Sequence, residues 1–399
     1  MTPDPLAGLP VVWSPDCLRH EPAGEVWLGV REPGTEVPDR GRVLLDAVAA
    51  AGAEIRSPER HGRAPLLAVH DAALVEHLAT VWADWEAAGY PAEHGRDRVV
   101  PYVFPTPGLL AGLPMRDPAA LHGRVGRYCY DTMTLVGPGS WEAIAAAADS
   151  AVTAAGLVAG GARTAYALCR PPGHHAGPAA YGGSCYLNNA AIAAQALRDA
   201  GAGQVAVIDI DAHHGNGTQA AFYDSDEVLF VSLHEYPLYP GTGALEEVGS
   251  GRGKGSTINV PFPSGTSGDA YRLALDELVV PAAERFSPSW LLVSAGFDGH
   301  RADPLTDLGL TAGDFADLTE RVARIVPPGR RVFFLEGGYD LEALAASAGA
   351  TVAALAGASY RPEQPSTGGF DGSLGAGPAG RPRAIVQAAW QLHERSLEG

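Results

Sequence analysis

The chain has 399 residues, 46% of them hydrophobic, so it can bury a large core, and its 28 basic against 46 acidic residues give a net charge of −18. That charge argues against a nucleic-acid partner and is compatible with a cationic substrate. The four cysteines (Cys17, Cys129, Cys169, Cys185) show no paired spacing, and we find neither a signal segment nor a run of 18 apolar residues, so we expect a soluble cytoplasmic protein with reduced thiols and no membrane contact.

The amino-terminal third alternates short regular elements with irregular chain. A strand and two helices are predicted at 11–13, 42–51 and 72–85. From 86 to 140 the periodicity fades into a segment punctuated by proline and glycine, which is typical of a functional loop or an interface. Ser140 is predicted to cap an alanine-rich helix from Trp141 to Val158.

Strands and helices then alternate to residue 356. Strands are predicted near 164–169, 204–210, 227–233, 290–295 and 331–336, and helices near 188–200, 269–286, 314–326 and 341–356. Serial winding of this kind predicts one α/β domain over 1–399 with its core at 10–356, built as a three-layer sandwich around a mostly parallel central sheet. Residues 359–383 read as a surface linker to a last helix at 384–396.

The segment VAVIDIDAHHGNG, residues 205–217, is the most informative in the chain. Its apolar residues predict a buried parallel strand, and Asp209, Asp211 and His213 follow at the carboxyl end. Carboxylates beside apolar neighbours are costly to bury unless something pairs with them. A divalent cation coordinated by Asp211 and His213 would provide that pairing.

Three more predicted strands end in residues suited to the same chemistry. WLLVSAGFD ends at Asp298, TAYALCRPPGHH ends at His174 and His175, and RVFFLEGGY ends at Tyr339. Ligands of open α/β sheets bind outside the carboxyl ends of the strands, where several loops converge. We therefore expect these side chains to form one reaction centre.

Each acidic residue taken alone could equally cap a helix or stabilise a turn. Taken together, Asp211, His213 and Asp298 favour a metal site with an open position, which suits catalytic zinc, although iron or cobalt could occupy it. Asp209 and Asn216 are natural acceptors that would fix the tautomers of the paired histidines. The histidines His214, His234 and His300 are interpreted as structural or surface residues, and Cys185 as a small buried hydrophobic residue and not a nucleophile.

With these residues identified, the chain resembles the zinc-dependent histone deacetylase superfamily, which includes bacterial acetylpolyamine amidohydrolases. The resemblance covers roughly residues 10–356. It rests on RPPGHHAG, GGSCYLNNAAIAA, VIDIDAHHGNGTQ, VSLHEYPLYPGTG, VSAGFDGHRADPL and LEGGYDLEAL, which follow one another in the family's order.

The resemblance implies the arginase-deacetylase fold and a zinc ion held by Asp211, His213 and Asp298. It implies His175 as general base, His174 as electrostatic partner or acid, and Tyr339 as hydrogen-bond donor to the substrate carbonyl. Asn216 follows the class II pattern of the family. A structural potassium ion is also implied, bound by the side chains of Asp209 and Ser232 and by the carbonyls of Asp211, His213 and Leu233.

Substrate contacts are expected from Gly183, Ser184, Tyr239 and Leu305. Relatives usually carry an aromatic residue where this chain has Ser184, so a wider or more polar channel is expected. Some polyamine-selective relatives carry a glutamate where this chain has Leu305. The 86–140 loop resembles that of bacterial acetylpolyamine amidohydrolases, in which it restricts the channel and builds a homodimer.

The predicted function is hydrolysis of a small N-acetylated amine, with acetylpolyamines as the favoured class. Acyl-lysine in proteins or peptides and acylated specialised metabolites are alternatives that keep the same chemistry. A metal-binding regulatory protein without catalysis is a third hypothesis, disfavoured because ligands, histidines and tyrosine are all present. Recognition of a remote ammonium needs carboxylates at the entrance, for which Glu93 and Asp117 are the candidates from sequence.

Overall fold

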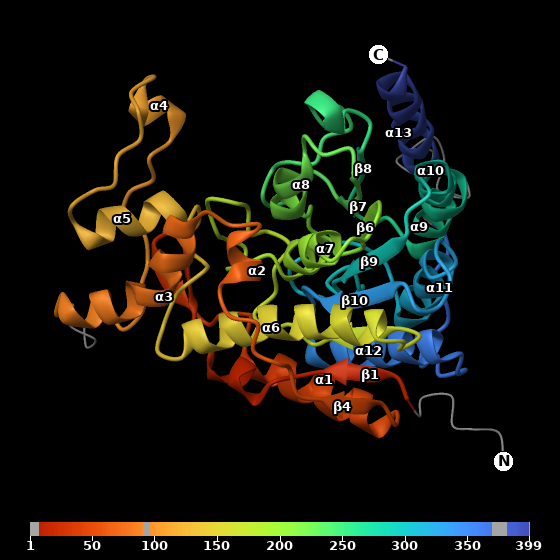
Figure 1. The fold of residues 1–399 in the computed structure, drawn as a ribbon, viewed down its shortest axis with the longest axis horizontal. Helices are drawn as coiled ribbons and strands as arrows, with labels where there is room; N and C mark the ends of the chain where they lie inside the picture. Colours follow the sequence, from red (N-terminus) through yellow and green to blue (C-terminus); the bar gives the residue numbers. More distant parts are fainter. Residues whose placement is uncertain (1–7, 91–95, 369–380, 399) are drawn as a thin grey trace.

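The computed structural model describes residues 8–90, 96–368 and 381–398. Its centre is an eight-stranded sheet in the order β4-β1-β5-β10-β9-β6-β7-β8, in which every neighbouring pair is parallel (Figure 1). The strands are β1 (Pro10–Val12), β4 (Glu54–Arg56), β5 (Ala165–Ala167), β6 (Val205–Asp209), β7 (Val228–Glu235), β8 (Thr257–Phe262), β9 (Trp290–Ala295) and β10 (Arg331–Leu335). The predicted parallel α/β architecture is confirmed.

Side chains along each strand alternate between two apolar layers. In β6, Val205 and Val207 belong to one buried cluster while Ala206 and Ile208 belong to the other. The first layer is covered by α6 (Ser140–Ala159), α7 (Asn189–Asp199) and α8 (Asn216–Phe222). The second is covered by α1 (Pro38–Ala50), α9 (Gly268–Ala274), a π-helical turn (Leu275–Val279), α10 (Val280–Phe286), α11 (Ala312–Val322), α12 (Leu341–Ala356) and α13 (Arg381–Leu397).

A lateral region packs beside the sheet around a third apolar cluster. The helices α2 (Ala64–Leu67), α3 (Ala72–Ala87) and α5 (Leu121–Tyr128) contribute to this cluster, whereas α4 (Pro107–Leu110) has no buried residue. Within the predicted 86–140 loop, the chain between Val99 and Tyr128 forms an arm that carries α4 at its tip, away from the body (Figure 1). A separate antiparallel hairpin is formed by β2 (Glu25–Trp27) and β3 (Val30–Glu32).

Some local expectations were wrong or incomplete. Strands β4 and β8 and the β2-β3 hairpin were not predicted. Ser140 is the first residue of α6 and not its cap, which is Gly139. The Ser140 hydroxyl instead accepts from the amide of Gly137 and lies 2.9 Å from Nδ1 of His20.

The predicted linker is partly outside the described residues, because 369–380 are not described. Its first part is held to the body. Nη2 of Arg361 donates to Glu320 at 2.7 Å, and Glu363 lies 2.7 Å from Nε2 of His300. This segment is therefore docked where a surface linker was expected.

Helix α6 is 20 residues long and is, by length and composition, apolar enough to cross a membrane. Of its most apolar window, 61% is buried inside the fold, against α7 and the sheet. Its apolar character is thus accounted for by core packing.

The buried ring of His70 ties α2 to the loops that lead into the site. Its Nε2 accepts from the amide of Asn188 at 2.9 Å, and Nδ1 donates to the carbonyl of Gly177 at 2.9 Å. Both bonds require a neutral ring with the proton on Nδ1. Burial lowers the pKa of His70 from 6.5 to about 4.

We predict that His70→Gln makes the stability of the fold less sensitive to acid. Between pH 6.5 and 4 the unfolded chain binds a proton at His70 that the folded chain does not, so this residue lowers the free energy of unfolding as pH falls, by about 1.4 kcal/mol per pH unit. Glutamine keeps an acceptor and a donor but does not titrate. Urea unfolding across this range should give a shallower slope for the variant, and identical slopes would contradict the role of His70.

Candidate metal centre and active site

The candidate site is built at the carboxyl ends of adjacent strands. Strands β5, β10, β9, β6 and β7 are consecutive in the sheet, and the predicted site residues follow or end these strands. His174 and His175 follow β5, Tyr339 follows β10, and Asp298 follows β9. The sheet therefore brings together side chains from residues 174 to 339, as expected from the sequence.

The three predicted metal ligands form a compact buried group. Ligand atoms of Asp211, His213 and Asp298 all lie within 4.8 Å of one another. Nδ1 of His213 is 2.8 Å from Oδ2 of Asp298 and 3.3 Å from Oδ1 of Asp211. The backbone amide of Gly337 donates to Asp211 at 2.8 Å, and a side chain at Gly337 would lie 2.3 Å from Asp298. The glycine is required because the carboxylates occupy that space.

The electrostatics of this group favour a cation. Burial alone would lower the pKa of His213, but the charge of Asp298 and hydrogen bonds to both carboxylates raise it to about 10. Burial and the neighbouring charge of Asp211 raise the pKa of Asp298. Two fully buried carboxylates that stabilise a positive charge beside them fit a divalent metal ion, and the oxygen and nitrogen donor set is one that zinc uses.

A second group of ligand-type atoms, from His174, Cys185 and Glu336, also lies within 4.8 Å. The carboxylate of Glu336 is already engaged, since it accepts from the amides of Gly173 and His174 and from the hydroxyl of Ser294. The group at Asp211 is therefore the better metal candidate.

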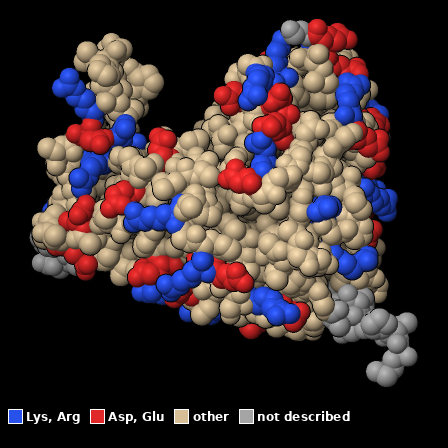
Figure 2. Space-filling view, viewed as in Figure 1, with Lys and Arg blue, Asp and Glu red and all other residues tan. Residues whose placement is uncertain are grey.

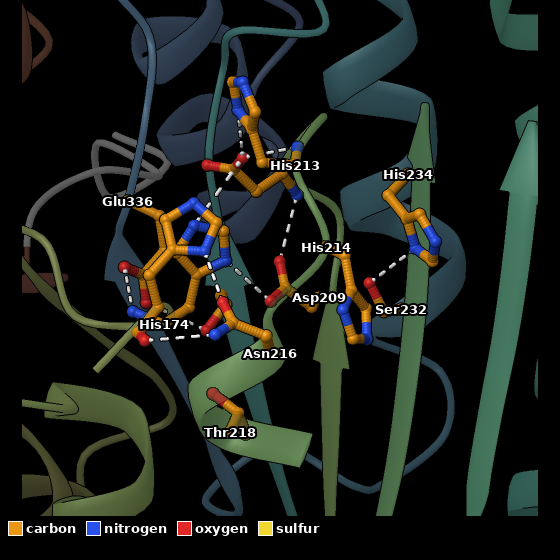
Figure 3. Close-up of polar contacts among 12 residues, drawn as sticks. His174, Asp209, His213, His214, Asn216, Thr218, Ser232, His234 and Glu336 are labelled. Atoms are coloured by element: carbon orange, nitrogen blue, oxygen red, sulfur yellow. Dashed lines mark hydrogen bonds and ion pairs between the residues drawn. The ribbon is translucent and has the colours of Figure 1, made fainter. Parts of the chain in front are cut away.

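The two adjacent histidines lie with ring centroids 4.1 Å apart and have different partners. Nδ1 of His174 is 2.9 Å from Asp209 (Figure 3). Nδ1 of His175 is 2.7 Å from Oδ1 of Asn216. Because an amide oxygen can only accept, Nδ1 of His175 donates, and in the neutral ring Nε2 then carries the free lone pair. Both orienting acceptors are those expected from the sequence.

The protonation tendencies of the two rings diverge. Burial, followed by the charges of His174 and His213, holds the pKa of His175 well below 6.5. Burial also opposes the charged form of His174, but the charges of Asp211 and Asp209 raise its pKa well above 6.5. A neutral ring beside a ring that holds its proton is an arrangement suited to acid and base chemistry.

Tyr339 is held by one contact to its backbone and one to its ring. Its amide donates to Oδ2 of Asp303 at 2.7 Å, and the guanidinium carbon of Arg40 lies 4.8 Å from its ring centroid. Burial raises the pKa of Tyr339 well above 10, although Arg40 opposes this shift. The phenol therefore keeps its proton and can donate a hydrogen bond.

The two side chains expected to bind potassium lie on the neighbouring strands β6 and β7, next to the predicted metal ligands. Asp209 and Ser232 are register partners on β6 and β7, and both are fully buried. Asp209 contacts His174 and accepts from the amide of Asp211 at 3.1 Å, while the Ser232 hydroxyl lies 2.9 Å from His234 (Figure 3). His214 and His234 take part in hydrogen bonds of the buried interior, as structural residues would.

A cavity of about 540 Å³ opens onto the candidate site. All four predicted substrate contacts line it: Gly183, Ser184, Tyr239 and Leu305, together with His175, His213 and Tyr339. A side chain at Gly183 would lie 2.3 Å from the ring of His175. The Tyr239 hydroxyl donates to Asp131 at 2.8 Å, which holds one wall in place.

The carboxylates in the cavity wall are Glu25 and Glu32. These two residues are register partners across the β2-β3 hairpin, and Trp27 lies on the same face as Glu25. They differ from the two candidates named from sequence. Glu93 lies outside the described residues, and Asp117 forms an ion pair with Arg127 on the arm.

Sequence reasoning also missed Tyr130, whose hydroxyl donates to the carbonyl of His175 at 3.0 Å. The signal for the hairpin was present as EVWLGVRE, an alternating segment around a Leu-Gly turn. For Tyr130 the sequence offered no comparable pattern.

Comparisons with known proteins agree with this geometry. Residues 34–355 match the family described as histone deacetylase domain. Acetylpolyamine amidohydrolase 1 of Pseudomonas aeruginosa is 40% identical over 343 residues, which is 84% of this chain and 96% of that protein. Acetylpolyamine amidohydrolase of Mycoplana ramosa is 38% identical over 335 residues, 83% of this chain and 95% of that protein.

A solved structure of acetylpolyamine aminohydrolase from Burkholderia pseudomallei is similar to this fold with a TM-score of 0.79. It is 38% identical and covers 87% of this chain and 98% of its own. The resemblance noted in the sequence motifs is thereby confirmed over most of the chain. The chain belongs to the histone deacetylase family.

Proposed function

We propose that this protein is a metal-dependent deacetylase that hydrolyses N-acetylated polyamines to acetate and the free amine. The observation that carries the proposal is the buried group of Asp211, His213 and Asp298 beside the neutral ring of His175, at a cavity whose wall holds two carboxylates. The similarity to acetylpolyamine amidohydrolases over most of the chain supports the substrate class.

Asp211, His213 and Asp298 would hold the metal, with zinc the best fit to this donor set. Zinc bound there would supply Lewis-acid activation of a water molecule and of the amide carbonyl. A potassium ion at Asp209, Ser232 and the nearby carbonyls of Asp211, His213 and Leu233 belongs to the same proposal. Elemental analysis of the purified protein tests both ions.

The chain's own groups account for the proton transfers. The free Nε2 of His175 takes the proton of the attacking water, and Asn216 keeps the other ring nitrogen protonated. The Tyr339 phenol donates to the developing oxyanion. His174, which holds a proton against Asp209, or the newly protonated His175 delivers one to the departing amine.

The hairpin gives the cavity its charge preference. Glu25 and Glu32 place like charges opposite one another on the two strands. The amide and hydroxyl of Thr35 donate to Oε1 of Glu25, and a cation between the two carboxylates would relieve the repulsion that remains. Polyamines carry ammonium groups beyond the acetylated nitrogen, and Trp27 beside the carboxylates can also contact a cation through its ring. A neutral acyl amide would gain nothing from this face.

The double variant Glu25→Gln, Glu32→Gln is expected to raise KM for N-acetylputrescine and N-acetylspermidine about tenfold, with little change in kcat. Each exposed pair of a carboxylate and an ammonium group contributes about 0.2–1 kcal/mol to binding, and the variant removes both carboxylates. Turnover of an uncharged N-alkylacetamide should not change. Glu21→Gln serves as a control, since Glu21 accepts from the amide of Ala23 on the exposed surface. A KM change of equal size for charged and uncharged substrates would contradict recognition by the hairpin.

The decisive assay compares acetylated polyamines with an acetyl-lysine peptide and with bulkier acyl amides. Higher kcat/KM on the polyamines supports the proposal. Equal or better turnover of the peptide would favour a protein deacetylase, and preference for bulky amides would favour specialised metabolites. Inactivity of the metal-loaded protein on all three classes would favour a binding or regulatory role.

The arm is proposed as the contact of a homodimer. Apolar side chains are exposed along it, with Tyr102, Leu109 and Leu113 each more than half exposed. Figure 2 shows the arm separated from the body by an open notch, with a tip largely free of charged residues. Light scattering should give twice the mass of one chain for the wild type, and the mass of one chain for the double variant Leu109→Glu, Leu113→Glu.

The four unpaired cysteines support a cytoplasmic location.

A further inference from the structure

Two arginines are completely buried beneath the candidate site, and one carboxylate lies between them. Arg40 and Arg170 are both 0% exposed, and Glu36 is 2% exposed. Oε1 of Glu36 lies 3.0 Å from Nη1 of Arg40 and 2.8 Å from Nε of Arg170, while Oε2 accepts from Nη2 of Arg170 at 2.9 Å. Burial of three charges is costly unless each is well paired, so this arrangement requires an explanation.

One arginine holds the Tyr339 loop. Nε of Arg40 donates to the carbonyl of Gly338 at 2.6 Å, and its Nη2 donates to the carbonyl of Glu336 at 2.6 Å. The same guanidinium lies over the Tyr339 ring. Arg40 thus contacts the loop on both sides of Gly337 and reaches the phenol that faces the cavity.

The other arginine holds the loop of the paired histidines. Arg170 begins the segment Arg-Pro-Pro-Gly that leads to His174, and its Nη1 donates to the carbonyl of Cys17 at 2.7 Å. At the far end of this segment, the amides of Gly173 and His174 donate to the carboxylate of Glu336, at 2.7 and 3.0 Å.

These contacts close a ring. It runs from Glu36 through Arg40 to the backbone of 336–338, through the Glu336 side chain to His174, and back along the chain through Arg170 to Glu36. The ring joins the loop that carries the donor phenol to the loop that carries the base. Removing the Glu36 charge would open it and leave two guanidinium groups without their shared carboxylate.

We infer that Glu36 is a positioning residue, which acts through Arg40 and Arg170 to set the distance between the Tyr339 phenol and the His175 ring. This inference rests on the proposed deacetylase function. Rates that depend on two groups acting on one substrate are sensitive to small changes in their separation. Glu36 itself does not line the cavity, so substrate binding should be preserved.

The test is a kinetic cycle with Glu36→Gln, Tyr339→Phe and the double variant, assayed on N-acetylputrescine with metal content and thermal unfolding measured in parallel. We expect Glu36→Gln to lower kcat about tenfold or more with KM nearly unchanged and metal retained. In the Tyr339→Phe background, Glu36→Gln should lower kcat by less than about threefold, because the two residues act as a unit. Glu142→Gln, which removes a half-exposed ion pair with Arg19, is the matched control.

Fully additive losses of kcat would overturn the inference, as would a change confined to KM, metal content or melting temperature. If Glu36→Gln does not fold, the same cycle with Glu36→Asp decides, since the shorter side chain keeps the charge but changes the spacing of the ring. An inactive wild-type protein would refute the proposed function, whereas an active wild type with an unchanged Glu36 variant would refute only this inference.

Discussion

Replacing Tyr339 with phenylalanine is expected to lower kcat on acetylated polyamines about 10²- to 10³-fold while leaving the metal bound. The phenol keeps its proton because its pKa is raised well above 10, and it would donate to the oxyanion, a contribution worth about 3–4 kcal/mol. The ring and its contact with Arg40 remain in phenylalanine, so the loop should keep its place. Steady-state kinetics with parallel zinc analysis measures both quantities.

Tyr223→Phe is a suitable control, because it removes a hydroxyl from a partly buried tyrosine at the end of α8, outside the cavity lining. Its activity should equal that of the wild type. Wild-type turnover by Tyr339→Phe would remove the phenol from the mechanism, and loss of metal in that variant would show a structural effect instead.

The second large effect is expected from His175→Ala, with kcat reduced about 10²- to 10⁴-fold and metal content unchanged. His175 is the neutral ring of the pair, and it lies outside the group of three ligands. The vacated space opens into a cavity of about 540 Å³, so added imidazole should restore part of the activity.

His61→Ala provides the comparison, since its ring lies 2.9 Å from Thr153 and does not line the cavity. Imidazole should have no effect on that variant. If His175→Ala retains full turnover, another group must accept the proton, and His174 would become the candidate base.

The sequence predicts the metal group well because parallel strands impose their own geometry. Asp211, His213 and Asp298 each follow an apolar run, and neighbouring parallel strands end at the same edge. No tertiary information is needed to expect convergence. The orienting roles of Asp209 and Asn216 follow from the same reasoning, since they flank the ligands in the chain.

Residues that act from a distance could not be predicted in this way. Glu36 and Arg40 precede or begin a helix whose pattern indicates only burial, and their partners are 134 and 298 residues away in sequence. Strand β8 was missed for a different reason. Pro261 interrupts its pattern, and proline is tolerated there because β8 is the edge strand of the sheet.

The hairpin that carries Glu25 and Glu32 is joined to the body by an ion pair between Arg31 and Asp97 and by contacts with Thr132. The amide of Val26 donates to the carbonyl of Thr132 at 3.0 Å, and the Thr132 hydroxyl donates back to Val26 at 2.7 Å. The neighbouring Asp131 holds Tyr239 and the amide of Gly183. The carboxylates proposed to bind the amine thus lie on a different element from the strand ends proposed to hold the metal. Substitutions within the eight residues Glu25–Glu32 are therefore expected to change which amine is preferred without moving the residues proposed to hold the metal.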